Sequence, residues 1–233
     1  MNRVTLQSGN AKLVIDPNGG YIEEYSMHGE PILFAAEIRG KRRATHVCVP
    51  NFGPDASGQW EQHGFGRKVH WQIALVEEDK MRLKYLVGEG RYAGLDCELE
   101  YALAEDHLTM KLACHNNGEN ALWLAPGFHP YFVVPEGVNE VRFDEQRYCI
   151  DNLAGSEYIA TDTSTHTIGL GHRTVRMTSE NLKTVVLWSE EPSRFVCVEP
   201  TLNGNSFFDH ATPPEQELLV PGETKDYSFS LLI

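Results

Sequence analysis

The chain has 233 residues, a length that suits one large domain or two small ones, and we expect a single domain over 1–233 because all-β folds of this size are often undivided. Its 33 acidic and 20 basic residues give a net charge of -13, which argues against a nucleic-acid or anionic-membrane partner. The first residues contain no apolar signal segment, no run has the length to span a bilayer, and five widely spaced cysteines form no CxxC pair. We therefore expect a cytoplasmic protein with reduced cysteines.

Short apolar runs separated by Gly, Pro, Asn and Asp recur along the whole chain, and no long helix is indicated. This pattern predicts an all-β fold, either a sandwich or a barrel. Several runs alternate polar and apolar side chains, as half-buried antiparallel strands do. In chain order, the expected strands are 11–15, 21–25, 31–34, 69–75, 81–86, 95–104, 108–112 and 227–233. The region 139–179 is expected to hold weak strands and no chemistry.

A long stretch from Pro50 to Gln62 contains Pro, Gly, Asp and Ser without an apolar period. We expect a loop here, and long loops in compact domains are usually functional. The segment His63-Gly64-Phe65-Gly66-Arg67 closes this loop. Its two glycines permit the close approach of a ligand or of backbone, which places His63 and Arg67 at a loop mouth. The alternative is a glycine turn with an exposed cation.

A histidine among aromatic and turn-forming residues stands out in Gly127-Phe128-His129-Pro130-Tyr131-Phe132. If this segment is extended, His129 and Tyr131 share one face, and Phe128, Pro130 and Phe132 share the other. Because Pro130 cannot donate to a β-ladder, we expect a sheet edge or a bulge here. On position alone, a structural histidine with satisfied hydrogen bonds is the more common case.

A carboxylate ends the apolar run Phe195-Val196-Cys197-Val198-Glu199-Pro200. Pro200 is expected to stop the ladder and to leave Glu199 at the mouth of a sheet. Burial there would raise the pKa of Glu199, whereas a nearby cation would lower it, and both outcomes are open. Taken alone, a glutamate at a strand end is usually structural or exposed.

Four cations occupy five positions, Arg39, Lys41, Arg42 and Arg43, in an otherwise acidic chain. They indicate a local anion site, such as one for a sugar phosphate, although a solvated charged face is the commoner case. Ten histidines show no HxH, HExxH or Cys/His ligand spacing, so no metal site is expected. A GxSxG elbow and a phosphate-binding glycine loop are also missing from the sequence. An imidazole, a carboxylate, cations and aromatic faces remain, which favours an acid-base pair in a sugar cleft.

Four motifs together resemble the aldose 1-epimerase (galactose mutarotase) superfamily: GFHPYF at 127–132, HGFGR at 63–67, VCVEP at 196–200 and LLVPGETKDYSFSLLI at 218–233. The opening 12–33 and the segment 42–54 agree as well, so the resemblance covers nearly the whole chain. It is most similar to the glucose-6-phosphate 1-epimerase-like branch. The resemblance implies a large antiparallel β-sandwich, the galactose mutarotase-like supersandwich, with substrate in a cleft across one sheet.

The same resemblance implies roles for individual residues. His129 matches the general acid and Glu199 the general base, His63 matches a histidine that hydrogen-bonds the sugar, and Arg42 matches a substrate-binding arginine, with Arg43 one position away. Two departures concern specificity: Arg43-Ala44 replaces a double glycine, and Thr201 replaces an aromatic residue. Arg67 is expected either to bind a phosphate or to support the loop. The side chains of His129 and Glu199 are expected to converge on one cleft, about one sugar ring apart, with His63 on the rim of the cleft.

The sequence therefore predicts a mutarotase that interconverts the α and β anomers of a hexose or hexose 6-phosphate. Its His/Glu pair opens and recloses the ring by general acid-base catalysis without a cofactor. The expected partner is a small-molecule sugar or sugar phosphate, and the expected state is a monomer or homodimer. A non-catalytic carbohydrate-binding protein on the same scaffold is the main alternative, because folds host many functions. A lyase or hydrolase of a sugar acid is a third possibility.

Overall fold

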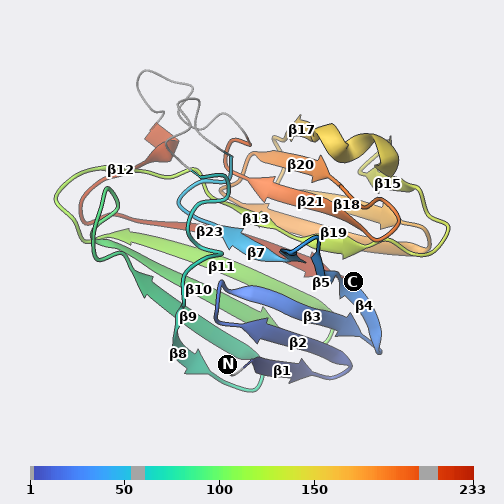
Figure 1. Cartoon of the computed structure of the whole chain (residues 1–233), viewed down its shortest axis with the longest axis horizontal. Helices are drawn as coiled ribbons and strands as arrows, with labels where there is room; N and C mark the ends of the chain where they lie inside the picture. Colours follow the sequence, from blue (N-terminus) through green and yellow to red (C-terminus); the bar gives the residue numbers. More distant parts are fainter. Residues whose placement is uncertain (1–2, 54–60, 205–214) are drawn as a thin grey trace.

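The computed structural model describes residues 3–53, 61–204 and 215–233 (Figure 1). Its larger sheet has ten strands, and all its pairings are antiparallel. Along the main path the order is β1 (Val4–Ser8), β2 (Ala11–Asp16), β3 (Tyr21–Met27), β4 (Glu30–Leu33), β14 (Tyr131–Val133), β21 (Phe195–Thr201), β13 (Gly127–His129) and β7 (His46–Cys48). From β21 the sheet also continues through β20 (Thr184–Trp188) to β17 (Glu157–Ala160).

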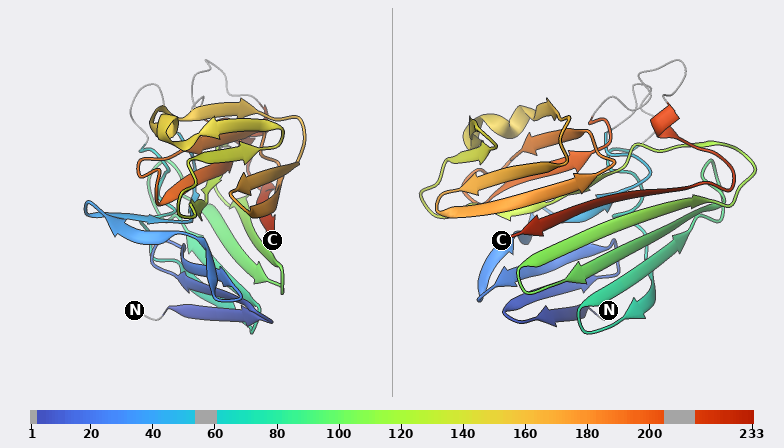
Figure 2. Two further views of the ribbon diagram at one scale, coloured as in Figure 1. Left: turned by 90° about the vertical axis from the view of Figure 1, so that its right-hand side faces the viewer. Right: turned by 180° about the vertical axis from the view of Figure 1, so that it is seen from behind.

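A second antiparallel sheet of nine strands packs behind the first, and Figure 2 shows it in front when the molecule is turned round. Its order is β16 (Gln146–Cys149), β15 (Glu140–Phe143), β18 (Thr165–Leu170), β19 (Arg173–Glu180), β23 (Thr224–Leu232), β11 (His107–Asn116), β10 (Leu95–Leu103), β9 (Lys80–Leu86) and β8 (Gln72–Val76). Smaller elements complete the described chain: the hairpin β5 (Ala35–Ile38) with β6 (Lys41–Ala44), the pair β12 (Leu122–Trp123) with β22 (Leu218–Leu219), and the 3-10 turns η1 (Ile150–Gly155) and η2 (Glu215–Glu217).

The predicted all-β sandwich is thus confirmed, and its core lies between the two large sheets. Alternate residues of β10 and β11 are buried, as their polar-apolar patterns predict. Phe128 of the larger sheet meets Phe229 of the smaller one, with ring centroids 4.9 Å apart. Burying one such side chain contributes about 2–3 kcal/mol. In the part of the chain that the structure describes, no helix is long and apolar enough to cross a membrane.

One predicted strand, 69–75, is wrong in its extent. The ladder with β9 begins only at Gln72, and Ile73 is 48% exposed at this sheet edge. The preceding residues bond elsewhere: Trp71 N donates to Pro17 O, and Gly19 N donates to Val69 O. Trp71 itself is fully buried and donates from its indole to Gly66 O. The first half of the apolar run therefore anchors a turn instead of extending the sheet.

The segment around Pro130 lies inside the larger sheet, so the prediction of a sheet edge is wrong. On one side β13 and β14 both pair with β21 in a single register, and on the other β13 pairs with β7 while β14 pairs with β4. Pro130 falls where the neighbour changes from β7 to β4, so its missing donor interrupts the strand without exposing it. The next amide, Tyr131 N, donates to Thr45 Oγ1.

Pro200 does not end its strand, so the prediction of Glu199 at a sheet mouth is also wrong. In β21, Pro200 faces Val185, and Thr201 pairs with both Thr184 and Gly127. A proline removes one donor only, and the strands on both sides restore the pairing at the next residue. Glu199 therefore lies within a central strand and is 1% exposed.

Candidate active site

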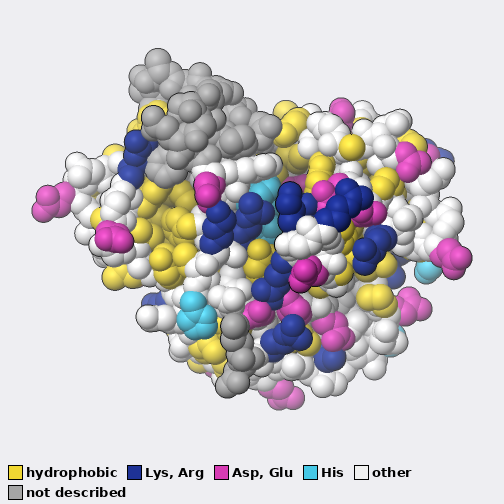
Figure 3. Space-filling view, viewed as in Figure 1, with side chains coloured by type: hydrophobic (Ala, Val, Ile, Leu, Met, Phe, Trp, Pro, Cys, Tyr) yellow, Lys and Arg dark blue, Asp and Glu magenta, His cyan; other side chains and the backbone are white. Residues whose placement is uncertain are grey.

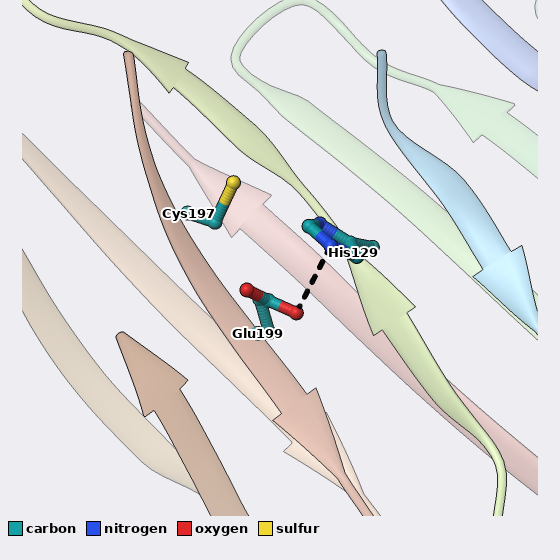
Figure 4. A group of neighbouring side chains, drawn as sticks. All are labelled: His129, Cys197 and Glu199. Atoms are coloured by element: carbon teal, nitrogen blue, oxygen red, sulfur yellow. Dashed lines mark ion pairs between the residues drawn. The ribbon is translucent and has the colours of Figure 1, made fainter. Parts of the chain in front are cut away.

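His129 and Glu199 face each other across neighbouring strands. Because β13 and β14 keep one register against β21, continuing it through Pro130 puts His129 directly opposite Glu199. Opposed side chains of an antiparallel pair start about 4.5–5.5 Å apart at Cβ. Here His129 Nε2 lies 3.4 Å from Glu199 Oε2 (Figure 4). The pair converges as expected, but at a contact distance shorter than the width of a sugar ring.

The face predicted from strand alternation is confirmed. His129 and Tyr131 lie on the same side of the strand with their rings stacked, 4.6 Å apart and 8° from parallel. Phe128 and Phe132 point the other way, into the core between the sheets. Trp188, from the neighbouring part of the sheet, meets the His129 ring edge-on at 5.9 Å. The histidine is therefore held by aromatic contacts on the face that carries Glu199.

Burial controls the charges of this pair. His129 is 3% exposed, and burial, followed by the nearby His63 and His46, lowers its pKa well below the usual 6.5. Burial also raises the pKa of Glu199 well above 4.5, which answers the question that the sequence leaves open. Both shifts favour neutral side chains, so the pair holds one proton between its two members.

Two polar atoms of the pair make no hydrogen bond within the described residues, His129 Nδ1 and Glu199 Oε2. Buried polar atoms in folded proteins are nearly always paired, and an unpaired one calls for an explanation. Both residues line a cleft with a volume of about 590 Å³. A ligand that supplies hydrogen-bond partners in this cleft would satisfy Glu199.

Two further histidines surround His129. His63 packs edge-on against it at 4.8 Å, and His46 stacks on it at 4.9 Å. His46 was missed in the sequence because it sits in an apolar run, and only the pairing of β7 with β13 places it opposite His129. Its Nδ1 donates to Ala44 O at 2.8 Å, and burial lowers its pKa to about 3. His46 is therefore a neutral neighbour of His129.

Glycine geometry fixes the position of His63. A Cβ at Gly64 would lie 2.2 Å from Val49 O, so only glycine fits there, and the close approach is to backbone. His63 itself has a φ of 68°, in the left-handed region, and its Nδ1 lies 3.4 Å from Cys48 Sγ. His63 lines the cleft and is 8% exposed. Residues 54–60 of the loop predicted to be functional lie outside the described part of the chain.

All five residues predicted for the site line this one cleft: Arg42, His63, Arg67, His129 and Glu199. Lys41, Arg43 and Lys68 line it as well, and Figure 3 shows Lys and Arg side chains gathered beside a histidine in the middle of this face. Arg39 belongs to the same cationic run in sequence but does not line the cleft. It is exposed and pairs with Glu191 at 2.9 Å.

The arginines of the cleft differ in their partners. Arg42 binds Asp16 at 2.8 Å and also Glu23, and its guanidinium lies 4.0 Å above the Tyr21 ring. Arg43 pairs with Glu190. Arg67 donates to the backbone oxygen of Gln62 at 3.2 Å, and it has no carboxylate partner among the described residues. Its charge is thus less compensated than those of Arg42 and Arg43.

Residues that the sequence did not single out also line the cleft. Trp188 and Glu190 come from the end of β20 and the turn after it, and Ser156 and Tyr158 come from the start of β17 and the residue before it. The last two lie in the region 139–179, where no chemistry was expected. Their polar-apolar pattern is weak, and only the pairing of β17 with β20 brings them to the cleft.

Comparisons with known proteins agree with this architecture. A family model described as aldose 1-epimerase matches residues 4–167. A curated relative, YphB of Escherichia coli K12, is 27% identical over 154 residues, which cover 57% of this chain and 52% of that protein, so the chain spans about half the length of the curated relative it matches.

Two solved structures illustrate the likeness in fold. A galactose mutarotase related enzyme from Lactobacillus acidophilus superposes with a TM-score of 0.84 at 17% identity, covering 99% of this chain and 97% of that one. A galactose mutarotase-like protein from Lactobacillus casei also has a TM-score of 0.84, at 14% identity, covering 99% of each chain. At these identities the two structures establish the fold alone.

Proposed function

Because the chain belongs to the aldose 1-epimerase family, we propose that it is a mutarotase that interconverts the α and β anomers of a hexose or hexose 6-phosphate. His129 and Glu199 are the proposed proton donor and acceptor. The observation that carries the proposal is their direct opposition on neighbouring strands, 3.4 Å apart, at the wall of a cleft.

Anomerisation needs two proton transfers at neighbouring oxygens. The ring oxygen must receive a proton and the C1 hydroxyl must lose one, after which the open aldehyde rotates and recloses. Both oxygens are bonded to the same carbon, so the acid and the base have to be close neighbours. His129 and Glu199 meet that requirement. Each positioned proton transfer is typically worth about 10²–10⁴ in rate.

The proton shared by the pair is the working proton. In the neutral pair this proton rests on the Glu199 carboxyl. When it passes to His129, the imidazolium delivers it to the ring oxygen while the Glu199 carboxylate takes the proton of the C1 hydroxyl, and the roles reverse when the ring closes from the other face. Every turnover then returns the pair to one proton. Burial disfavours a lone charge on either residue, which favours this one-proton form of the pair.

Substrate contacts follow from the charges around the cleft. His63 is proposed to hydrogen-bond the sugar. Arg42 and Arg43 already have carboxylate partners, so they are suited to donate to sugar hydroxyls. Arg67, without such a partner in the described chain, is the proposed seat of a phosphate. An anion there matches a guanidinium better than a neutral hydroxyl does.

The proposed activity is tested by polarimetry of freshly dissolved α-glucose, α-galactose and glucose 6-phosphate. We expect faster equilibration of at least one of them, and a loss of about 10²–10⁴-fold in His129→Asn and Glu199→Gln. Sugar binding without faster equilibration would favour the carbohydrate-binding alternative. A product other than the opposite anomer would point to a lyase or hydrolase.

A further inference from the structure

Cys197 lies beside the proposed catalytic pair and has no part in the proton transfers. It stands two residues before Glu199 in β21, so both side chains project from the same face of the strand, and His129 faces them from β13. One ligand atom from each of the three lies within 4.8 Å of the other two (Figure 4). All three side chains are buried, and Cys197 is fully so.

These three atoms are a nitrogen, a sulfur and an oxygen, the ligands that Zn²⁺ prefers. In a tetrahedral site with bonds of about 2.0–2.3 Å, ligand atoms stand roughly 3.3–3.5 Å apart. His129 Nε2 and Glu199 Oε2 are already 3.4 Å apart. Bringing the Cys197 thiol from at most 4.8 Å to that spacing takes a movement of up to about 1.3 Å, which turns the side chain away from its staggered position.

An independent observation also points to a missing ligand. Glu199 Oε2 is buried and makes no hydrogen bond within the described residues, although the carboxyl group lines the cleft. Its contact is with His129 Nε2 at 3.4 Å, and His129 is itself a proposed ligand, so coordination displaces no other group from this oxygen. The neutral imidazole of His129 is the form that binds metals.

We propose that His129, Cys197 and Glu199 form a three-ligand site for a soft divalent cation, Zn²⁺, and that the bound cation blocks the cleft to the sugar. His129 and Glu199 line the cleft, and the fourth coordination position is left for water. This cation acts as an inhibitor and not as a cofactor, because it occupies the two groups that must exchange protons. The inhibition rests on the proposed mutarotase function, whereas the binding itself does not.

Charge balance favours this ion at this place. Zn²⁺ bound by a carboxylate, a thiolate and a neutral imidazole is neutral overall, and binding releases the protons that the free ligands carry. A neutral complex suits a site where burial opposes a single charge. Arg43 and Arg67 oppose the approach of a cation, and Glu190 offsets part of that field.

Binding is measured first, independently of activity. Titration of the purified protein with Co²⁺ should give a near-ultraviolet thiolate-to-metal band that saturates at one ion per chain, and Zn²⁺ should displace it. Cys197→Ser and Cys197→Ala should lose the band, and Cys149→Ser, which removes an exposed thiol, should keep it. Loss of outer partners already costs about 10–100-fold in metal affinity, so loss of the thiolate should weaken Zn²⁺ binding by at least about 100-fold.

Inhibition is measured next by polarimetry with Zn²⁺ and, as a control for ionic strength, Mg²⁺. Zn²⁺ should abolish anomerisation, Mg²⁺ should not, and both Cys197 variants should remain active at Zn²⁺ concentrations that stop the wild type. Absence of a saturable thiolate band, or equal Zn²⁺ affinity in wild type and both Cys197 variants, would overturn the proposed site. A protein that binds Zn²⁺ through Cys197 but anomerises no sugar would leave the site standing and refute the mutarotase function.

Discussion

Replacing Glu199 with Gln should remove activity and stabilise the fold in a pH-dependent way. Glu199 is 1% exposed, and burial raises its pKa well above 4.5. In the unfolded chain the carboxyl group ionises near its ordinary value. Between that value and its raised folded pKa, the folded state keeps a proton that the unfolded state has lost, so wild-type stability falls as pH rises. The Glu199→Gln variant has no ionisable proton at this position, so its free energy of unfolding has no such dependence on pH.

The expected difference grows by about 1.4 kcal/mol for each pH unit in that window. For a chain of 233 residues this corresponds to a rise of about 3–5 °C in the melting temperature of Glu199→Gln over wild type per pH unit. Thermal unfolding followed by circular dichroism from pH 4.5 upward measures it. The test is how the difference in melting temperature changes with pH. Any effect of the amide group that does not depend on pH shifts this difference by the same amount at every pH. A difference that stays flat from pH 4.5 to 8 would refute the burial argument.

Three further outcomes are expected. The rate of anomerisation should show a broad plateau with pH. The one-proton form of the pair is lost only when His129 is protonated, at a pH below 6.5, or when Glu199 ionises, at a pH well above 4.5. A fall in rate on the acid side with a midpoint at or above pH 6.5 would contradict the lowered pKa of His129. Arg67→Met should reduce kcat/KM for glucose 6-phosphate by about 10-fold or more and leave kcat/KM for glucose unchanged. The control Arg39→Met, outside the cleft, should change kcat/KM for neither sugar. Equal losses on both sugars would mean that Arg67 only supports the loop. Phe128→Ala should lower the free energy of unfolding by about 3–5 kcal/mol in urea titrations, because its ring fills the space against the second sheet, and a loss below about 1 kcal/mol would place it outside the core.

The sequence predicted the parts of the fold that depend on local alternation. The residues of β9, β10 and β11 show it clearly, and the closing strand β23 was predicted as well, although its position in the middle of the nine-stranded sheet was not. Trp71 is a residue for which local alternation does not predict the structure. Its run alternates like a strand, but its amide bonds to Pro17 O, a contact between segments that periodicity cannot reveal.

Proline misled the sequence interpretation twice for one reason. Pro130 and Pro200 each lack a donor, and the sequence pattern equates that with an edge or an end. In the folded sheet, strands on both sides bridge each gap: Pro130 lies between β13 and β14, and both of these strands pair with β21, which contains Pro200. His129 and Glu199 are therefore buried opposite one another, and this arrangement produces their pKa shifts.

Some residues reach the site only through the pairing of strands, which a single sequence does not reveal. His63 and Arg67 were found from a glycine-rich loop, but His46 carries no motif, and its place beside His129 comes from the pairing of β7 with β13. Cys197 was predicted only to be one of five reduced cysteines, and its position beside His129 and Glu199 appears only when two strands are brought together. A single domain, a cytoplasmic location and a monomeric or homodimeric state stay predictions.

The central claim is that His129 and Glu199 exchange protons with a sugar. The most direct measurement is the polarimetric rate of equilibration of freshly dissolved α-glucose, α-galactose and glucose 6-phosphate with wild type, His129→Asn and Glu199→Gln at one protein concentration. We expect wild type to accelerate the equilibration of at least one sugar, and each variant to lose about 10²–10⁴-fold of that acceleration. Equal rates with and without wild-type protein for all three sugars, or variants as fast as wild type, would contradict it.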